Sequence, residues 1–367
     1  MLGPYFFEKN LKKMGKIIGL TYDLKTDRVL SNDDPADANA ELDKPQTIDS
    51  VAKAFESAGH RVVRIGNVWN LLRQMDDLDV DIVFNICEGY QGRNRESQVP
   101  ILLELKGIPY VGSDALSLGI TLDKIVAKKC FIADGIPTPR SFEANDSENL
   151  KKKMGKLKFP LIVKPHHEGS SKGLSPNSRV HDMGGLKRQI DLINGKYKQT
   201  ALVEEFIKGT EFTVGIIGNK KPEALPVVQI AIEGKTYLGE DFYTFTRLST
   251  QADQIQYLCP AKISKKLFAQ LQDLAVRAYQ SVGCADFGRV DFRVDDKGRP
   301  YVLEINPLPC LAEEDTFFFM AEAIGISYNG IVNKILDTAL ERYGLNKSAV
   351  RKRNQNALSG QEAPVRS

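Results

Sequence analysis

The sequence has few cysteines and few histidines, and neither residue type is spaced as in a zinc site or a disulfide framework. Five cysteines occur in 367 residues, an odd number, and none of them forms a Cys-x-x-Cys pair. This usage is typical of reduced thiols in an intracellular protein. Only four histidines occur. For the adjacent pair His166-His167 we expect ordinary loop residues and no metal site.

Long apolar runs are also missing. No segment approaches the roughly 18 consecutive apolar residues of a membrane-spanning helix, and the lysine-rich N-terminus has no apolar core of a secretory signal. The formal net charge is only +3, which argues against strong attraction to nucleic acid or to a membrane surface. We therefore expect a cytoplasmic protein that binds neither nucleic acid nor membrane.

The composition is that of a globular protein, with 42% hydrophobic and 26% charged residues. A chain of 367 residues exceeds one ordinary domain, so two or three compact units sharing a cleft are expected. Strand-like segments at 16–22, 61–65 and 81–86 alternate with a helix-like segment at about 45–57. This alternation predicts a parallel α/β sheet covered on both faces. The polar segment 23–43 is expected to be a loop.

A glycine-rich, charged loop runs from Glu88 to Glu96, directly after the third of these strands. Open α/β sheets bind ligands at the carboxyl ends of their parallel strands. We therefore expect Glu88 near a ligand, with a plain surface turn as the alternative.

A second loop follows a strand at 159–165 that ends in Lys164-Pro165. It contains Glu168-Gly-Ser-Ser171 and then Lys172. Backbone N–H groups and hydroxyls bracketed by two lysines suit a flexible flap over phosphates. The signal is weak on its own, because such loops are often merely flexible linkers.

The segment 202–207 is an apolar strand that contains Glu204 and Glu205. It fits a hinge that holds an adenine edge, with Glu211 near a ribose; a salt-bridged surface strand is the competing interpretation. Residues 234–256 are polar, and we expect a long loop there that serves as a lid. Helices are expected at 265–281 and at about 328–343.

Two β-rich runs flank the turn at 295–298 and predict a β-hairpin. Alternation along a strand puts Arg289 and Asp291 on one face, and Glu304 and Asn306 on one face of the partner strand. If these faces coincide, the hairpin gathers hard oxygen ligands of the kind that hold Mg²⁺ on nucleotide phosphates. The alternative is a charged, solvated hairpin face.

These motifs together resemble an ATP-grasp enzyme, and more closely the D-alanine–D-alanine ligase group, over about residues 80–345. The resemblance implies an α/β fold, α+β in the C-terminal half, with three domains. They are an N-terminal parallel α/β preATP-grasp domain (15–120), a central subdomain with the flap (121–202) and a C-terminal subdomain with the metal and catalytic site (203–345). Residues 1–14 are expected to be an extension and 346–367 a disordered tail.

The resemblance also implies ATP and Mg²⁺ as cofactors, with two metal ions and Mn²⁺ as an alternative. A substrate carboxylate would attack the γ-phosphate, and an amine would then attack the acylphosphate. The partners are therefore a small-molecule carboxylate and amine, and the family suggests a homodimer. The residues that match the family's site are, for catalysis, Arg289, Ser170, Glu88 and Arg247; for the nucleotide, Lys124, Lys164, Glu168, Ser170, Ser171, Glu204, Glu205, Phe206, Ile207 and Glu211; and for the metal, Asp291, Glu304 and Asn306.

The chain departs from the family pattern at three places. Glu88 stands where the family has a histidine, Arg247 is the nearest cation to the position of a lid lysine, and Asp315 stands where a serine binds the second substrate's carboxylate. Because a carboxylate at 315 would repel a substrate carboxylate, we expect an acceptor that is cationic or lacks a carboxylate at that end. We expect Glu41 or Asp43 to hold the first substrate's ammonium.

We therefore expect an ADP-forming carboxylate–amine ligase that does not carry out standard D-alanyl-D-alanine synthesis. Two alternatives remain open: a true D-alanine–D-alanine ligase of cell-wall synthesis, and a nucleotide-binding protein that has lost its chemistry.

Overall fold

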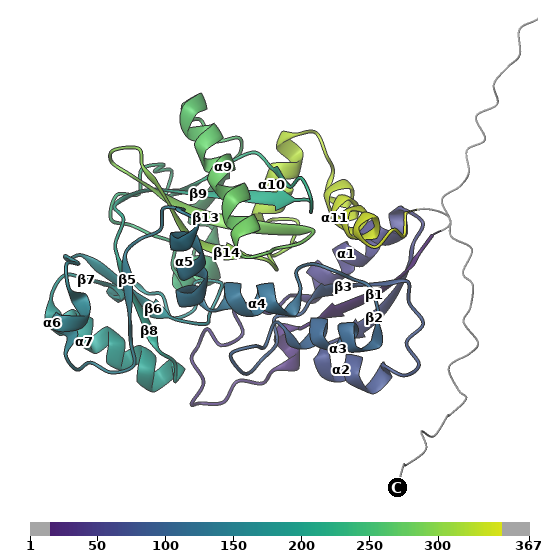
Figure 1. Ribbon diagram of the computed structural model, residues 1–367, viewed down its shortest axis with the longest axis horizontal. Coiled ribbons are helices and arrows are strands. Elements are labelled where there is room, and N and C mark those ends of the chain that lie inside the picture. The colour runs from purple at the N-terminus through teal and green to yellow at the C-terminus, as the bar shows by residue number, and fades with distance from the viewer. Residues whose placement is uncertain (1–14, 347–367) are drawn as a thin grey trace, which may run out of the picture.

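Three β-sheets organise the chain (Figure 1). The computed structural model describes residues 15–346. The expected N-terminal extension and all but the first residue of the expected tail lie outside the described residues. No helix in the described part of the chain is long and apolar enough to cross a membrane.

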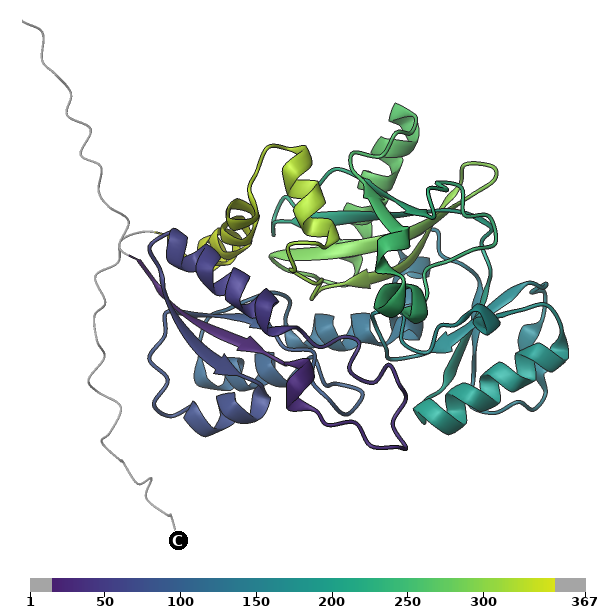
Figure 2. The same cartoon turned by 180° about the vertical axis from the view of Figure 1, so that it is seen from behind.

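The first sheet is parallel, as the alternation of strands and helices predicts. Its order is β2-β1-β3-β4, with strands β1 Ile17–Tyr22, β2 Arg61–Gly66, β3 Ile82–Ile86 and β4 Tyr110–Val111. Strand β3 is buried along its whole length, because helices cover both faces of the sheet. Helices α2 (Val68–Gln74) and α3 (Gln98–Lys106) pack on one face, and α1 (Pro45–Ser57) and α11 (Tyr328–Arg342) on the other (Figure 2).

The second sheet is antiparallel, in the order β5-β8-β6-β7. Its strands are β5 Ser141–Ala144, β6 Leu161–Pro165, β7 Arg179–Val180 and β8 Ala201–Glu205. One face packs on α7 (Met183–Leu192) through Leu186 and Ile190, and the short α6 (Leu150–Met154) adds Leu150 to the same core. Strand β6 carries the chain into the expected flap.

The third sheet is antiparallel and contains the expected hairpin. Its order is β12-β11-β9-β13-β14, with β10 paired to β9. Its strands are β9 Gly209–Ile217, β10 Glu223–Ala224, β11 Val228–Ile232, β12 Ile255–Leu258, β13 Phe287–Asp295 and β14 Pro300–Asn306. Helix α9 (Lys265–Ser281) covers one face, and α10 (Thr316–Ala323) packs on the other.

Two helices connect the first sheet to the rest. Helix α4 (Ala115–Leu122) leads into α5 (Lys124–Ala133). Phe131 of α5 is fully buried in the same core as α9 and the hairpin strands. Helix α5 therefore packs on the third sheet, although its residues belong to the predicted central domain. The domain boundaries themselves stay predictions.

The expected lid loop at 234–256 is partly regular structure, so that prediction is wrong for its second half. Helix α8 (Phe245–Thr250) and a 3₁₀ turn (Ala252–Gln254) lie within it, and β12 begins at Ile255. Ile255 and Tyr257 point toward the core, whereas Gln256 is exposed. An edge strand with only two inward-facing residues has too short an alternation of apolar and polar residues to be recognised as a strand within a polar segment.

Candidate active site

A cavity of about 270 Å³ lies where the three sheets meet, and side chains from all three units line it. Most of the residues singled out in the sequence are brought together there. Those that line the cavity are Glu88, Lys124, Lys164, Ser170, Ser171, Glu204, Glu205, Phe206, Ile207, Glu211, Arg289, Asp291, Glu304 and Asn306. Glu168 and Arg247 lie outside this lining.

The hairpin faces coincide, as the alternation predicts. Arg289 lies opposite Asn306, and Asp291 lies opposite Glu304 in the β13–β14 register. Arg289 donates from Nε and Nη2 to the two oxygens of Asp291, both at 3.0 Å. Thr213 on β9 donates to Asp291 Oδ1 at 2.6 Å. These side chains and the neighbouring Glu304 therefore form one cluster on the wall of the cavity.

The carboxylates of this cluster are suited to a hard divalent cation. Burial by itself would raise the pKa of Glu304, but the ammonium groups of Lys124 and Lys164 outweigh burial and hold that pKa below its ordinary value. Lys124 Nζ lies 3.2 Å from Glu304 Oε2. Mg²⁺ prefers oxygen ligands. Asp291, Glu304 and the Asn306 amide oxygen provide them from two adjacent strands, so these residues fit this ion.

Glu204 is the partner of two buried lysines. Lys128 Nζ lies 2.6 Å and Lys164 Nζ 2.8 Å from its two oxygens. Burial would raise the pKa of Glu204, yet the two ammonium groups lower it to about 2. The Glu204 carboxylate therefore holds two lysines and is not free to bind the edge of an adenine base. Lys128 was not singled out in the sequence; its position one helical turn after Lys124 was the available signal.

Glu211 is likewise bonded inside the protein. Arg293 Nη1 donates to Glu211 Oε1 at 2.7 Å, and the Arg293 guanidinium lies over the Phe206 ring at 4.9 Å from its centroid. Burial raises the pKa of Glu211 despite this guanidinium. Arg293 was missed in the sequence, although it shares a strand face with Arg289 and Asp291. Glu205 lies at the edge of the cavity and pairs with Arg140 at 3.0 Å.

The expected flap lies beside the cavity and has an unusual backbone. Ser170 and Ser171 adopt φ angles of 46° and 56°, in the left-handed region, and both line the cavity. Lys124 Nζ donates to the carbonyl oxygen of Glu168. The Glu168 side chain instead lies behind the flap, in ion pairs with Lys172 and with Arg95.

Arg247 is not brought into the cavity. Its Nη1 donates to the Phe242 carbonyl at 3.1 Å, and its Nη2 lies 3.6 Å from Asp241. Two tyrosines of the same region were missed in the sequence: Tyr243 and Tyr257 line the cavity, and their hydroxyls are hydrogen-bonded to each other.

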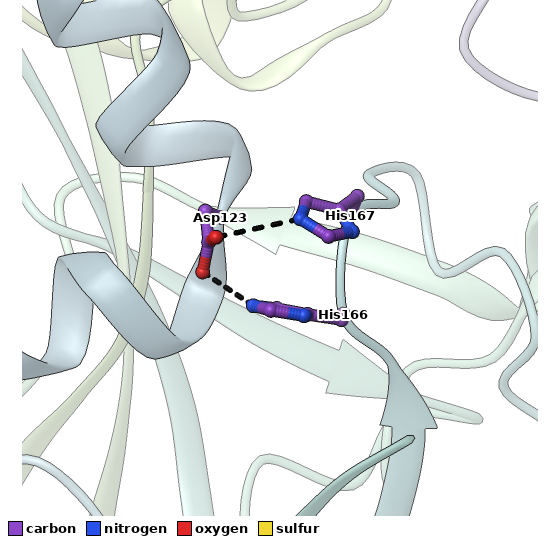
Figure 3. Close-up of side chains that lie close together, drawn as sticks. All are labelled: Asp123, His166 and His167. Atoms are coloured by element: carbon purple, nitrogen blue, oxygen red, sulfur yellow. Dashed lines mark hydrogen bonds and ion pairs between the residues drawn. The ribbon is translucent and has the colours of Figure 1, made fainter. Parts of the chain in front are cut away.

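The two adjacent histidines converge on Asp123 (Figure 3). Their ring nitrogens and a carboxylate oxygen lie within 4.8 Å of one another, and Nε2 of His166 is hydrogen-bonded to Asp123 Oδ1. Asp123 also caps α5 through the Val126 amide and binds Arg93 Nη2 at 2.6 Å. Because Asp123 already has these partners and a guanidinium beside it, we interpret the group as a hydrogen-bonded junction between β6 and α5. Asp123 is separated from His166 by 43 residues, so sequence spacing gave no sign of it.

Carboxylates gather at the end of the cavity next to Arg289. Asp43, Glu88 and Asp315 all line it, and Asp315 Oδ1 lies 3.8 Å from Arg289 Nη1. Burial, reinforced by Asp23 and then Asp315, raises the pKa of Asp43 to about 7. Burial and the neighbouring Glu96 raise the pKa of Glu88 well above its ordinary value. The charges of Lys25 and Arg95 oppose these two shifts but do not cancel them.

Comparisons with known proteins agree with this geometry. A model of the D-ala D-ala ligase C-terminus matches residues 136–337. The uncharacterized protein y4sG of Sinorhizobium fredii is 36% identical over 312 residues, which cover 80% of this chain and 88% of that protein. A D-alanine–D-alanine ligase of Pelotomaculum thermopropionicum is 30% identical over 311 residues, covering 82% and 93%. In fold, the chain is similar to the crystal structure of the D-alanine–D-alanine ligase from Bacillus anthracis complexed with ATP. The TM-score is 0.69 at 24% identity, over 91% of this chain and 100% of that one.

Proposed function

The chain belongs to the D-alanine–D-alanine ligase family of ATP-grasp enzymes, which are ADP-forming ligases that make carbon–nitrogen bonds, and from this premise we propose which chemistry it carries out. It joins a small carboxylic acid to an amine other than a second D-alanine. The single observation that supports an intact reaction centre is the β13–β14 register, which sets Asp291 against Glu304 and Arg289 against Asn306 on the cavity wall.

The reaction has two steps that these side chains can serve. The substrate carboxylate attacks the γ-phosphorus of ATP, and ADP leaves with its electron pair, giving an acylphosphate. The uncharged amine then attacks the acyl carbon, phosphate leaves, and the amine gives up a proton. Bound Mg²⁺ supplies charge neutralisation for the phosphate oxygens, and Asp291, Glu304 and Asn306 would hold it.

Positive side chains are arranged along this path. Lys124 and Lys164 line the cavity and are held by Glu304 and Glu204, so both ammonium groups are positioned before nucleotide binds. We propose that they contact the phosphates together with the flap residues Ser170 and Ser171. Arg289 lies between the metal-binding carboxylates and Asp315, where a guanidinium would stabilise the oxyanion of the tetrahedral intermediate.

The acidic end of the cavity supports the choice of acceptor. Asp315 faces Arg289, and Asp43 lines the same cavity without an ion pair to a lysine or arginine among the described contacts. A carboxylate-bearing acceptor would meet repulsion there, whereas a second cationic group would be attracted. We therefore propose an acceptor that carries an additional cationic group or lacks a carboxylate at that end.

The experiment is ADP release with Mg²⁺-ATP across D- and L-amino acids, diamines and diamino acids, singly and in pairs, with mass spectrometry of the products. ADP release that needs two substrates and gives a condensed mass with a cationic acceptor is the expected result. Formation of D-alanyl-D-alanine from D-alanine alone would overturn the acceptor proposal. Nucleotide binding with no turnover on any pair would favour the binding-protein alternative.

A further inference from the structure

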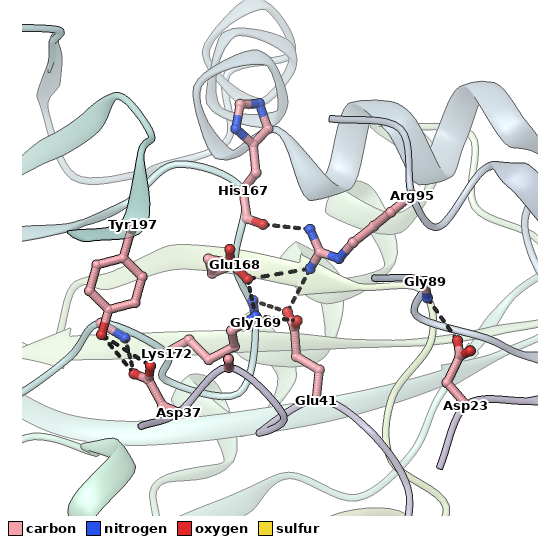
Figure 4. Close-up of polar contacts among 12 residues, drawn as sticks. Asp23, Asp37, Glu41, Gly89, Arg95, His167, Glu168, Gly169, Lys172 and Tyr197 are labelled. Atoms are coloured by element: carbon pink, nitrogen blue, oxygen red, sulfur yellow. Dashed lines mark hydrogen bonds and ion pairs between the residues drawn. The ribbon is translucent and has the colours of Figure 1, made fainter. Parts of the chain in front are cut away.

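The long loop between β1 and α1 lies against the flap (Figure 4). Its two ends are joined to each other: the Asp43 amide donates to the Asp23 carbonyl, and the Lys25 amide donates to the Asp43 carbonyl, both at 3.0 Å. Within the loop, Arg28 pairs with Asp34 at 2.9 Å, and Asn39 donates to the Arg28 carbonyl at 3.0 Å. These bonds give the loop a defined shape although it contains little regular structure.

Two carboxylates of this loop bind the flap at two separate points. Asp37 accepts from the backbone amide of Gly173 at 2.7 Å and from the Tyr197 hydroxyl at 2.9 Å. Glu41 accepts from the backbone amide of Gly169 and pairs with Lys172 Nζ at 2.9 Å. The loop therefore holds the flap on either side of Ser170 and Ser171.

The contacts are buried, so they are strong enough to restrain the flap. The side chains of Glu41 and Lys172 are 6% and 9% exposed, and Asp37 is 6% exposed. Arg95, in the segment between β3 and α3, also binds the Glu41 carboxylate, with its Nη2 at 2.8 Å from Glu41 Oε1. Burial would raise the pKa of Glu41, but Arg95 and Lys172 lower it to about 2, so the carboxylate stays ionised. Charge-assisted hydrogen bonds of this kind are roughly twice as strong as neutral ones.

We propose that the β1–α1 loop is a latch that holds the flap closed over the nucleotide, and that nucleotide exchange requires this latch to release. The inference rests on the proposed function, since the flap matters only if a nucleotide binds beneath it. Asp37 and Tyr197 do not line the cavity, so they act as positioning residues through the flap. The Glu41 carboxylate is bonded to Gly169 and Lys172 of the flap, so it is not free to bind the ammonium of the first substrate.

The test measures how fast a fluorescent ADP analogue with Mg²⁺ leaves the full-length protein, by stopped flow. Asp37→Asn is expected to speed release about tenfold, because it replaces a charge-assisted acceptor with a neutral amide. Tyr197→Phe keeps the ring, removes only the hydroxyl and is expected to speed release about threefold. Asp33→Asn is the matched control: its carboxylate lies in the same loop but is exposed, so release is expected to stay at the wild-type rate.

A second measurement needs no variant. If loop and flap are coupled, bound nucleotide must slow hydrogen exchange in residues 24–43, by reciprocity of linked equilibria. Saturation with Mg²⁺ and a non-hydrolysable ATP analogue should therefore protect this loop in the wild type. Release rates unchanged in Asp37→Asn and Tyr197→Phe, or exchange unchanged by nucleotide, would overturn the latch alone. A wild-type protein that binds no nucleotide would overturn both the latch and the proposed function.

Discussion

At the scale of single residues, buried carboxylates of the site differ in the charges that surround them, and their pKa values shift in opposite directions. Glu204 has two lysines, and its pKa falls to about 2. At Asp43, burial and the nearby carboxylates of Asp23 and Asp315 outweigh the charge of Lys25, and its pKa rises to about 7. The first carboxylate holds two lysines in place, whereas the charge of Lys25 does not offset burial and the neighbouring carboxylates at the second.

Glu204→Gln is expected to raise the KM for ATP about tenfold or more, because Lys128 and Lys164 lose the charge that positions them. The control is Glu143→Gln, an exposed carboxylate on the neighbouring strand β5 that does not line the cavity, which should change the KM little. Steady-state kinetics at saturating acid and amine would measure this. Equal effects of the two substitutions would contradict the role given to Glu204.

Asp43→Asn is expected to stabilise the protein above neutral pH. The folded protein keeps the Asp43 proton up to about pH 7, whereas the unfolded chain loses it near its ordinary value. The wild type therefore loses stability as pH rises through this window, and the variant does not. At pH 8 the gain in free energy of unfolding should be about 2–4 kcal/mol, and it should vanish below about pH 4. Denaturant unfolding at several pH values checks this, and a gain that does not depend on pH would contradict it.

Asp315→Ser tests acceptor selectivity. Asp315 caps α10 by accepting from the Thr316 amide at 2.6 Å, and serine can cap a helix equally well. The substitution should therefore keep the fold while removing the negative charge near Arg289. Activity toward simple α-amino acid acceptors is expected to rise, by about tenfold or more. Unchanged or lower activity in the paired-substrate assay would count against a cationic acceptor.

At the scale of secondary-structure elements, the β13–β14 hairpin shows how much the sequence can predict. Alternation and a turn motif were enough to predict which side chains share a face, because a strand has a period of two. Helices α1 and α9 also begin and end at the residues expected from the sequence. By contrast, β12 and α8 were missed, since short segments in a polar stretch become regular only by pairing with or packing on the rest of the fold.

The hairpin carboxylates give a further prediction. Asp291→Asn and Glu304→Gln are each expected to lower kcat by about a hundredfold or more, because each removes an ionised ligand for Mg²⁺. Asp296→Asn, at the exposed turn of the same hairpin, is the control and should keep its activity. Titration of activity with Mg²⁺ should show that the two site variants need more metal. Wild-type Mg²⁺ dependence in both would exclude these residues as ligands.

At the scale of the whole molecule, residues distant in the chain meet only after folding. Asp37 and Gly173 are 136 residues apart, and Arg342 of α11 binds Asp286 and the Tyr110 carbonyl of the first sheet. The rings of Phe84 and Phe287 lie 6.2 Å apart and join the cores of the first and third sheets. The latch could not be assigned from the sequence, because its contacts join residues far apart in the chain. Lys128 and Arg293 had local signals, but their partners Glu204 and Glu211 are equally distant in sequence. The hairpin residues could be predicted to share one face because a strand alternates locally.

The central claim is that the acid is activated as an acylphosphate. It is tested most directly by placing ¹⁸O in the carboxylate of an acid that forms product and analysing the released phosphate by mass spectrometry. The mechanism requires one ¹⁸O atom to pass from the carboxylate to the inorganic phosphate in each turnover. Phosphate without label, formed along with the condensed product, would show that the acid is not activated by phosphoryl transfer and would contradict the account.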